Sequence, residues 1–231
     1  MTELPPIVYV VDDEPAVLKS LARLLRASGF RSEAFSSARE FIQNHQADAA
    51  GCLVLDVMMP SFSGLELQQW LATAHNPLPI IFITGRGDVP TSVRAMKAGA
   101  VDFLTKPVDE QALLRAIEDA LRKDREIRAA RAELVTIRSR LARLTPRERE
   151  VLEHVVSGKL NKQIAAELGT VEKTIKVHRA RVMRKMEAKS LAELVRAAEA
   201  ASIGQRGSHG PQPSAVPRQP SGPDTPQHLD P

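Results

Sequence analysis

Four short apolar runs in the first half of the chain each end on a residue that can take part in phosphoryl chemistry. These residues are Asp12 and Asp13 after run 7–11, Asp56 after run 52–55, Thr84 after run 80–83, and Lys106 after run 101–105. A carboxylate can attack a phosphoryl group and form an acyl phosphate. A hydroxyl and an ammonium can bind phosphoryl oxygens. The residue types therefore predict a site for phosphoryl transfer, provided that the fold brings them together.

The apolar runs are expected to form the buried strands of a sheet. They are rich in Val and Ile and are separated by amphipathic stretches, which is typical of parallel strands joined by helices. A weaker strand is expected at an edge, over 31–35, and helices are expected from Pro15, over 37–45, over 64–73 and from Asp88. This order predicts an α/β fold with a doubly wound, five-stranded parallel sheet. The ligand site of such a sheet lies outside the carboxyl ends of its strands.

Asp56 is the candidate nucleophile, and three carboxylates form a candidate metal site around it. Asp12, Asp13 and Asp56 would repel one another, and a bound hard cation would remove that repulsion and screen an incoming phosphate. Mg²⁺ prefers one or two carboxylates together with phosphate oxygens and water. The backbone carbonyl of Met58, just past Asp56, is a further candidate ligand. The sequence therefore predicts Mg²⁺ as the cofactor.

Two further residues fit the phosphoryl oxygens of this site. Lys106 can neutralise one oxygen as a point charge, and Thr84 can donate a hydrogen bond to another. Pro107 follows Lys106, and a cis peptide bond there would fix the lysine loop. A single Asp at a strand end is usually a cap or a turn residue, but the agreement of all the spacings favours a functional site.

Charge divides the chain into an acidic front and a basic back. Residues 1–120 carry 10 basic and 15 acidic side chains, whereas residues 121–203 carry 20 and 11. This asymmetry indicates two domains, the second with a polyanionic partner. Cys52 is the one cysteine, so a disulfide framework is excluded. With no apolar stretch long enough to span a bilayer and no secretory signal, we expect a cytoplasmic protein without a membrane partner.

The back half is predicted to be all helical. No Gly or Pro occurs from Val108 to Thr145, which predicts one long helix that joins the domains. Thr145 and Glu148 have the spacing of a capping box, with Pro146 at the first helical position. Four helices should follow, over 146–157, 162–168, 172–186 and 191–201. The segment from Gly204 onward is rich in Pro, Ser, Gly and Gln and is expected to be disordered.

The predicted helix 172–186 has one apolar and one basic face. Ile175, Val182 and Met186 form the packing face. The opposite side mixes basic residues with small apolar ones, which suits a helix in the DNA major groove. The candidate DNA-binding residues are Lys173, Thr174, Lys176, Val177, His178, Arg179, Ala180, Arg181 and Arg184. A basic helix is often only a solvated face, but the turn before it and the charge of this half favour DNA.

The front half resembles the receiver domain of two-component response regulators, most of all the FixJ-like subgroup. The matching residues are Val10-Val11-Asp12-Asp13-Glu14, Leu55-Asp56-Val57-Met58-Met59-Pro60, Ile83-Thr84-Gly85, Ala95-Met96-Lys97-Ala98-Gly99-Ala100 and Lys106-Pro107. The resemblance implies a flavodoxin-like receiver over 5–121, in which Asp56 accepts phosphate from a sensor histidine kinase. It also implies that Thr84 and Phe103 move together as a switch. A homodimer would then form through 88–97 and 101–104.

The segment Leu144–Ala200 resembles the LuxR-type helix-turn-helix domain. The matching residues are Leu144-Thr145-Pro146-Arg147-Glu148, Asn161-Lys162-Gln163-Ile164-Ala165 and Thr174-Ile175-Lys176-Val177-His178-Arg179. The family usually starts its recognition helix with a Ser cap, but Val171 stands there and cannot cap. The resemblance implies a small all-α DNA-binding domain of four helices over 144–202. The sequence pattern adds a helical linker over 122–143 and a Pro-rich tail over 203–231.

Together with the residues, the two resemblances imply a regulator whose phosphorylation promotes dimerisation and binding to double-stranded DNA, with RNA polymerase as a further partner. Two alternatives stay open. A phosphatase-like hydrolase would also use a strand-end Asp, Mg²⁺, Thr and Lys, but it would need an acid two residues after the nucleophile, where Met58 stands. A DNA-binding module with a front half that serves only for dimerisation would not need the complete acidic set.

Overall fold

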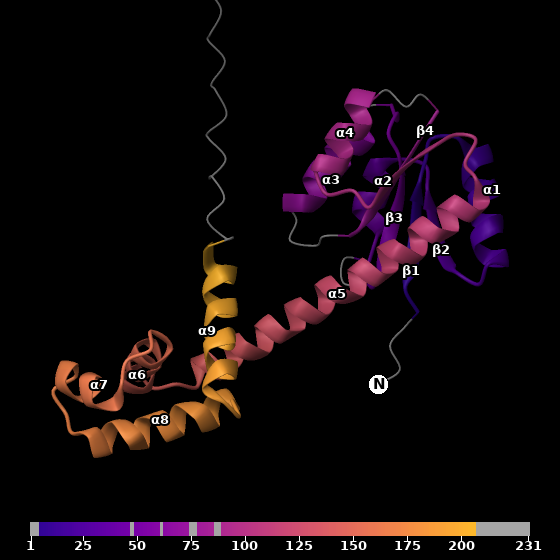
Figure 1. Ribbon diagram of the computed structural model, residues 1–231. Helices are drawn as coiled ribbons and strands as arrows, with labels where there is room; N and C mark the ends of the chain where they lie inside the picture. Colours follow the sequence, from indigo (N-terminus) through magenta and orange to yellow (C-terminus); the bar gives the residue numbers. More distant parts are fainter. Residues whose placement is uncertain (1–4, 47–48, 61, 74–77, 86–88, 207–231) are drawn as a thin grey trace, which may run out of the picture. The chain divides into compact units, whose positions relative to one another are not determined.

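A computed structural model of the protein describes residues 5–46, 49–60, 62–73, 78–85 and 89–206 (Figure 1). The chain divides into two compact units, Met1–Ala132 and Glu133–Pro231. Asp88, which was expected to start a helix, and residues 207–231 of the predicted tail lie outside the described residues. Within the described residues, no helix is both long enough and apolar enough to cross a membrane.

The described residues of the first unit form five parallel strands and five helices in alternation, the fifth helix continuing beyond the unit. Its elements are β1 Ile7–Val11, α1 Pro15–Ala27, β2 Arg31–Phe35, α2 Ala38–Asn44, β3 Gly51–Asp56, α3 Gly64–Thr73, β4 Ile80–Thr84, α4 Val89–Lys97, β5 Asp102–Thr105 and the start of α5 Glu110–Ala142. The strand order is β2-β1-β3-β4-β5, and every neighbouring pair is parallel. The predicted doubly wound sheet is confirmed, with β2 at an edge as expected.

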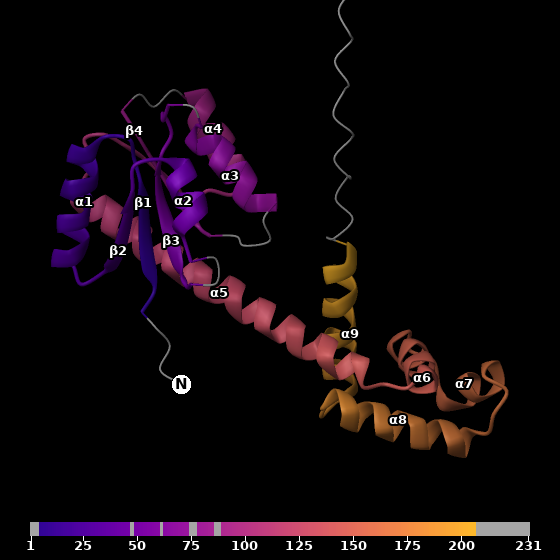
Figure 2. The ribbon, with the colours of Figure 1, turned by 180° about the vertical axis from the view of Figure 1, so that it is seen from behind.

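Helices cover both faces of this sheet (Figures 1 and 2). On one face, α2, α3 and α4 bury Phe41, Leu67 and Ala95 against the sheet residues Tyr9 and Phe82. On the other face, α1 and α5 close a second aliphatic layer with Leu21, Leu25, Leu113 and Ile117. Because side chains alternate between the faces of a strand, β1, β3 and β4 feed both layers and are buried throughout.

The helix α5 extends past the sheet and remains attached to it at the amino ends of β1 and β3. Asp124 is 2% exposed. Its carboxylate accepts a hydrogen bond from the backbone N–H of Gly51 at 3.0 Å and pairs with Arg128 at 2.8 Å. Arg128 also donates to the carbonyl oxygen of Ala49. The start of the segment expected as a linker therefore packs on the first unit, while Ile137 of the same helix belongs to the second core.

The second unit is helical. It contains the end of α5, then α6 Pro146–Val156, α7 Asn161–Glu167, α8 Glu172–Met186 and α9 Leu191–Arg206. The predicted capping box of Thr145 and Glu148 is present at the start of α6. Gly158 and Gly169 follow α6 and α7 with φ of +84° and +62°, a conformation that favours glycine. The last helix runs to Arg206, beyond the predicted end at Ala201, because Gly204 within it costs only about 1 kcal/mol relative to alanine.

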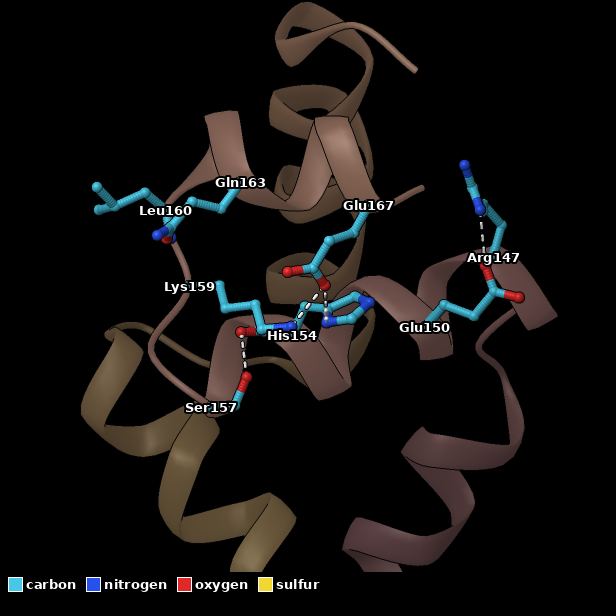
Figure 3. Close-up of polar contacts among 8 residues, drawn as sticks. All are labelled: Arg147, Glu150, His154, Ser157, Lys159, Leu160, Gln163 and Glu167. Atoms are coloured by element: carbon cyan, nitrogen blue, oxygen red, sulfur yellow. Dashed lines mark hydrogen bonds and ion pairs between the residues drawn. The ribbon is translucent and has the colours of Figure 1, made fainter. Parts of the chain in front are cut away.

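Buried apolar side chains from all these helices meet in one core. Ile175, Val182 and Met186, the predicted packing face of α8, pack with Ile164 and Ala165 of α7. Polar contacts tie the turns around that core, and Figure 3 shows those between α6 and α7. There the carboxylate of Glu167 pairs with Lys159 and lies 3.4 Å from Nδ1 of His154. The basic side of α8 stays outside the core.

Candidate functional site

The sequence-predicted residues of the first unit lie together at the carboxyl edge of the sheet. Asp12 and Asp13 directly follow β1, Asp56 and Thr84 are the last residues of β3 and β4, and Lys106 directly follows β5. Carboxylate oxygens of Asp12, Asp13 and Asp56 lie within 4.8 Å of one another. The Nζ of Lys106 lies 2.8 Å from Oδ2 of Asp12 and 3.8 Å from Oδ2 of Asp56. Parallel strands account for this convergence, since their carboxyl ends share one edge.

Backbone contacts hold the loops of this edge in place. The Val57 N–H donates to the carbonyl of Ile83 at 3.0 Å, and the Lys106 N–H donates to the carbonyl of Thr84 at 2.7 Å. Gly64 approaches so closely that a Cβ there would lie 2.3 Å from the carbonyl oxygen of Asp56, so only glycine fits. The peptide bond between Lys106 and Pro107 is cis, as predicted.

Burial makes the Asp56 carboxylate unusually basic. The residue is 3% exposed. Desolvation raises the pKa of Asp56 to about 6, with Asp12 and Asp13 adding repulsion, while Lys106 and the backbone N–H of Met58 oppose the rise. Burial acts to lower the pKa of Lys106, but its hydrogen bonds to Asp12 and Glu14 outweigh that effect and raise it. The pocket therefore holds concentrated negative charge that one ammonium compensates only in part.

This donor set fits a hard divalent cation. The three aspartates supply the oxygen ligands that Mg²⁺ prefers. Oδ1 of Asp56 is buried and has no hydrogen-bond partner among the described residues, so no protein donor competes with a cation for this oxygen. Met58 is 67% exposed. The ligand that the sequence suggested at this position is its backbone carbonyl.

The two expected switch residues differ in burial. Thr84 is fully buried at the end of β4. Phe103 of β5 is half-buried and packs against the core, with its ring centroid 6.3 Å from that of Phe82. Glu14 is a pocket residue that sequence reasoning did not assign. Its carboxylate lies 3.0 Å from Nζ of Lys106. The only signal for it was its place directly after the two aspartates.

The candidate DNA-binding residues of the second unit divide by exposure. Lys173, Lys176, Val177, Ala180, Arg181 and Arg184 are exposed on α8, whereas Thr174, His178 and Arg179 are half-buried. Arg179 donates to Oδ1 of Asn161 at 3.2 Å, so this guanidinium already holds α7. Val171 is the N-cap residue of α8 and makes no side-chain cap, as expected for valine. The exposed set forms a basic surface interrupted by small apolar side chains.

Comparison with known proteins agrees with both halves of the chain. The family model described as "Response regulator receiver domain" matches residues 8–118. The model described as "Bacterial regulatory proteins, luxR family" matches residues 142–198. Nodulation protein W of Bradyrhizobium diazoefficiens is 48% identical over 197 residues, which cover 85% of this chain and 87% of that protein.

Two solved structures resemble the chain over most of its length. The response regulator StyR matches with a TM-score of 0.73 and 47% identity, covering 85% of this chain and 99% of that one. Full-length FixJ from B. japonicum matches with a TM-score of 0.53 and 42% identity, covering 87% and 99%. These are families of regulators and not of metabolic enzymes. The chain belongs to the two-component response regulators that join a receiver domain to a LuxR-type DNA-binding domain.

Proposed function

We propose that phosphorylation of Asp56 by a sensor histidine kinase controls DNA binding by the second unit. The observation that carries this proposal is the meeting of Asp56 with Asp12, Asp13 and Lys106 at one edge of the sheet. The same chain presents an exposed basic helix, so a site for phosphoryl transfer and a surface for DNA occur in one protein. The receiver extends over 5–121 and the DNA-binding domain over 144–202, with 122–143 as the linker.

In the proposed transfer, a carboxylate oxygen of Asp56 attacks phosphorus. The P–N bond to the kinase's histidine breaks, its electron pair returns to the imidazole, and an acyl phosphate forms on Asp56. Lys106 pairs with a phosphoryl oxygen, which its present distance of 3.8 Å from Asp56 allows. Thr84, the last residue of the neighbouring strand β4, donates its hydroxyl to another oxygen.

Mg²⁺ would be held by the carboxylates of Asp12, Asp13 and Asp56 and by the backbone carbonyl of Met58. When bound, Mg²⁺ supplies positive charge that offsets the carboxylates and the phosphoryl oxygens. The unpartnered Oδ1 of Asp56 and the 4.8 Å cluster of carboxylate oxygens support this assignment.

The new charge is proposed to act on α4 and β5. Thr84 moves toward the phosphoryl group, Phe103 follows it, and the surface of α4 changes. Three apolar side chains on α4 support a dimer contact, since Val89 is 73% exposed and Val93 and Met96 are each 44% exposed. A dimer places two recognition helices on the two half-sites of an operator.

The proposed DNA contacts are the exposed residues of α8. Lys173 and Lys176 reach base edges or phosphates, Val177 and Ala180 contact thymine methyl groups, and Arg181 and Arg184 hold phosphates. The half-buried Thr174, His178 and Arg179 lie beside this surface. Bound regulator then acts on transcription through RNA polymerase.

One experiment tests the whole proposal. Genomic footprinting of wild type and Asp56→Asn, each with and without phosphoramidate, reports phosphate-dependent DNA binding. We expect wild type to be phosphorylated, to dimerise and to gain occupancy, and Asp56→Asn to do none of these. Asp119→Asn, an exposed aspartate of α5, is the matched control and should behave as wild type.

The DNA arm has its own controls. Lys176→Ala should weaken binding to the footprinted sites by about tenfold and reduce the salt slope by about one. Lys189→Ala removes the same charge outside α8 and should change little. Labelling of Asp56→Asn would show that the nucleophile is misassigned. Equal occupancy with and without phosphoramidate would instead favour a front half that serves only for dimerisation.

A further inference from the structure

Glu14 contacts Lys106 at the rim of the acidic pocket, although the proposed phosphoryl transfer gives it no role. It is the N-cap residue of α1, and its backbone N–H donates to Oδ1 of Asp12 at 2.9 Å. Its Oε1 accepts from Nζ of Lys106 at 3.0 Å. The Glu14 side chain is 61% exposed and that of Lys106 only 16%. The contact therefore lies where the pocket opens to solvent.

Lys106 is shared among three carboxylates, and its ammonium lies closer to the buried Asp12 and the exposed Glu14 than to Asp56. Its Nζ is 2.8 Å from Asp12 and 3.0 Å from Glu14, but 3.8 Å from Asp56. An ammonium has three protons to donate, so it can hold Asp12 and Glu14 together. Asp12 also belongs to the carboxylate cluster that fits a cation, whereas Glu14 lies outside that cluster. Glu14 therefore contacts Lys106 but has no assigned role in binding a cation.

We propose that Glu14 is a positioning residue: it holds Lys106 at the rim before phosphorylation and competes with phosphoryl oxygens for its ammonium. The inference rests on the proposed phosphorylation of Asp56. An exposed ion pair between flexible side chains is weak, so a phosphoryl group, with its higher charge, can displace Glu14. Glu14 therefore lowers the fraction of protein that is phosphorylated at a given supply of donor.

The test compares full-length wild type and Glu14→Gln with phosphoramidate and Mg²⁺. Removing the competitor should raise the phosphorylated fraction at limiting donor and slow hydrolysis after donor removal, each by about two- to fivefold, as for the loss of one exposed ion pair. Glu33→Gln is the matched control, because Glu33 pairs with Arg31 at 3.0 Å on the exposed edge strand β2. It loses the same charge in the same unit and should match wild type.

A second variant separates positioning from simple repulsion of the anionic donor. Glu14→Asp keeps the charge but shortens the side chain, so it should behave like Glu14→Gln if the contact with Lys106 matters. If Glu14 acted only by repelling the anionic donor, Glu14→Asp would behave like wild type. The rate at which the phosphorylated protein is hydrolysed would then be unchanged in both variants, because the attacking water is neutral. Urea unfolding followed by Trp70 fluorescence verifies that each variant is folded.

The outcomes separate this inference from the proposed function. A wild type that takes no phosphate on Asp56 overturns the proposed function and this inference with it. A wild type that is phosphorylated, with Glu14→Gln kinetics equal to those of Glu33→Gln, overturns the role of Glu14 alone. Glu14→Asp kinetics equal to those of wild type do the same, because they assign the effect to charge. Slower hydrolysis in both Glu14 variants supports the inference.

Discussion

Each unit of the chain buries a carboxylate beside a lysine, and the two carboxylates differ in the direction of their pKa shifts. Asp56 and Glu148 are both 3% exposed. The nearest lysine nitrogen is 3.8 Å from Asp56 but 2.6 Å from Glu148. Burial raises the pKa of Asp56 to about 6, whereas the hydrogen bonds from Lys185 and from Thr145 lower the pKa of Glu148 to about 2. Equal solvent exposure thus accompanies opposite pKa shifts, because desolvation is the largest effect on Asp56 and hydrogen bonding is the largest effect on Glu148.

Hydrogen bonds account for the low pKa of Glu148, and Asp56 has fewer of them to oppose its desolvation. Lys185 donates to Glu148 and to the carbonyl of Arg143, and the Thr145 N–H donates to the same carboxylate. Glu148 therefore joins the start of α6 to the end of α8. Lys106 is instead shared with Asp12 and Glu14, and Oδ1 of Asp56 has no partner within the described ranges. One carboxylate stabilises its unit, and the other is left available for a ligand.

A third buried carboxylate can break this comparison. Asp124 lies in the same unit as Asp56 but is fully paired, with the Gly51 N–H and Arg128 as donors. If hydrogen-bond partners decide whether a buried carboxylate stabilises its unit, Asp124→Ala should destabilise the first unit by about 2 to 3 kcal/mol, because it leaves the buried Gly51 N–H without its acceptor and removes the ion pair with Arg128. Urea unfolding measured by the fluorescence of Trp70, the single tryptophan, reports this unit.

The control lies on the same helix. Asp119 forms an exposed pair with Arg122 at 2.7 Å, so Asp119→Ala should change the free energy of unfolding by less than about 0.5 kcal/mol. Equal losses for the two variants would show that the contact with Gly51 contributes nothing, and the distinction between paired and unpaired carboxylates would fail.

The contacts of Asp124 also mark the limit of the sequence analysis. Asp12, Asp56 and Lys106 could be predicted to meet, because each follows a strand and parallel strands end at a common edge. Asp124 occurs in a stretch dominated by charge, where hydrophobic periodicity carries no signal. One of its partners is the backbone of Gly51, 73 residues away, and a backbone N–H leaves no mark in the sequence.

Local patterns were reliable guides in the second unit. The capping box of Thr145 and Glu148 is a short-range motif with a fixed geometry, and the structure has it. The absence of a side-chain cap at Val171 also followed from residue type. The contact between Glu148 and Lys185 spans 37 residues and could not be predicted, since Lys173 and Lys176 of α8 carry the same charge.

Asp56→Asn should sharpen the comparison by changing stability in the opposite direction. In EDTA at pH 7 we expect the first unit to gain about 2 kcal/mol, because a pKa raised by about two units destabilises the charged form. The native carboxyl binds a proton more tightly than the unfolded one, so the penalty is absent below about pH 4. This destabilisation grows as the pH rises from about 4 to about 6 and is complete above pH 6.

The measurement is urea unfolding of wild type and Asp56→Asn at pH 4, 6 and 8, again by Trp70 fluorescence. The gain should be close to zero at pH 4 and largest at pH 8. Addition of Mg²⁺ should then stabilise wild type more than the variant, since only wild type keeps all three carboxylates. A variant that is less stable than wild type at pH 8 would contradict the interpretation of Asp56 as an uncompensated charge.

Glu148→Gln should have the smallest effect on stability, and it should destabilise its unit, whereas Asp56→Asn should stabilise the first unit. The amide oxygen can still accept the Thr145 N–H, so only the charged contact with Lys185 is lost, at a cost of about 1 kcal/mol. Because the folded pKa lies below the usual 4.5, the wild-type advantage is complete above pH 4.5 and disappears as the pH falls toward 2. Hydrogen exchange of the α8 amides reports this unit. Glu150→Gln, which breaks an exposed pair with Arg147 on the same helix, should leave that exchange unchanged. Equal protection of the α8 amides in both variants would mean that the contact with Lys185 does not stabilise α8.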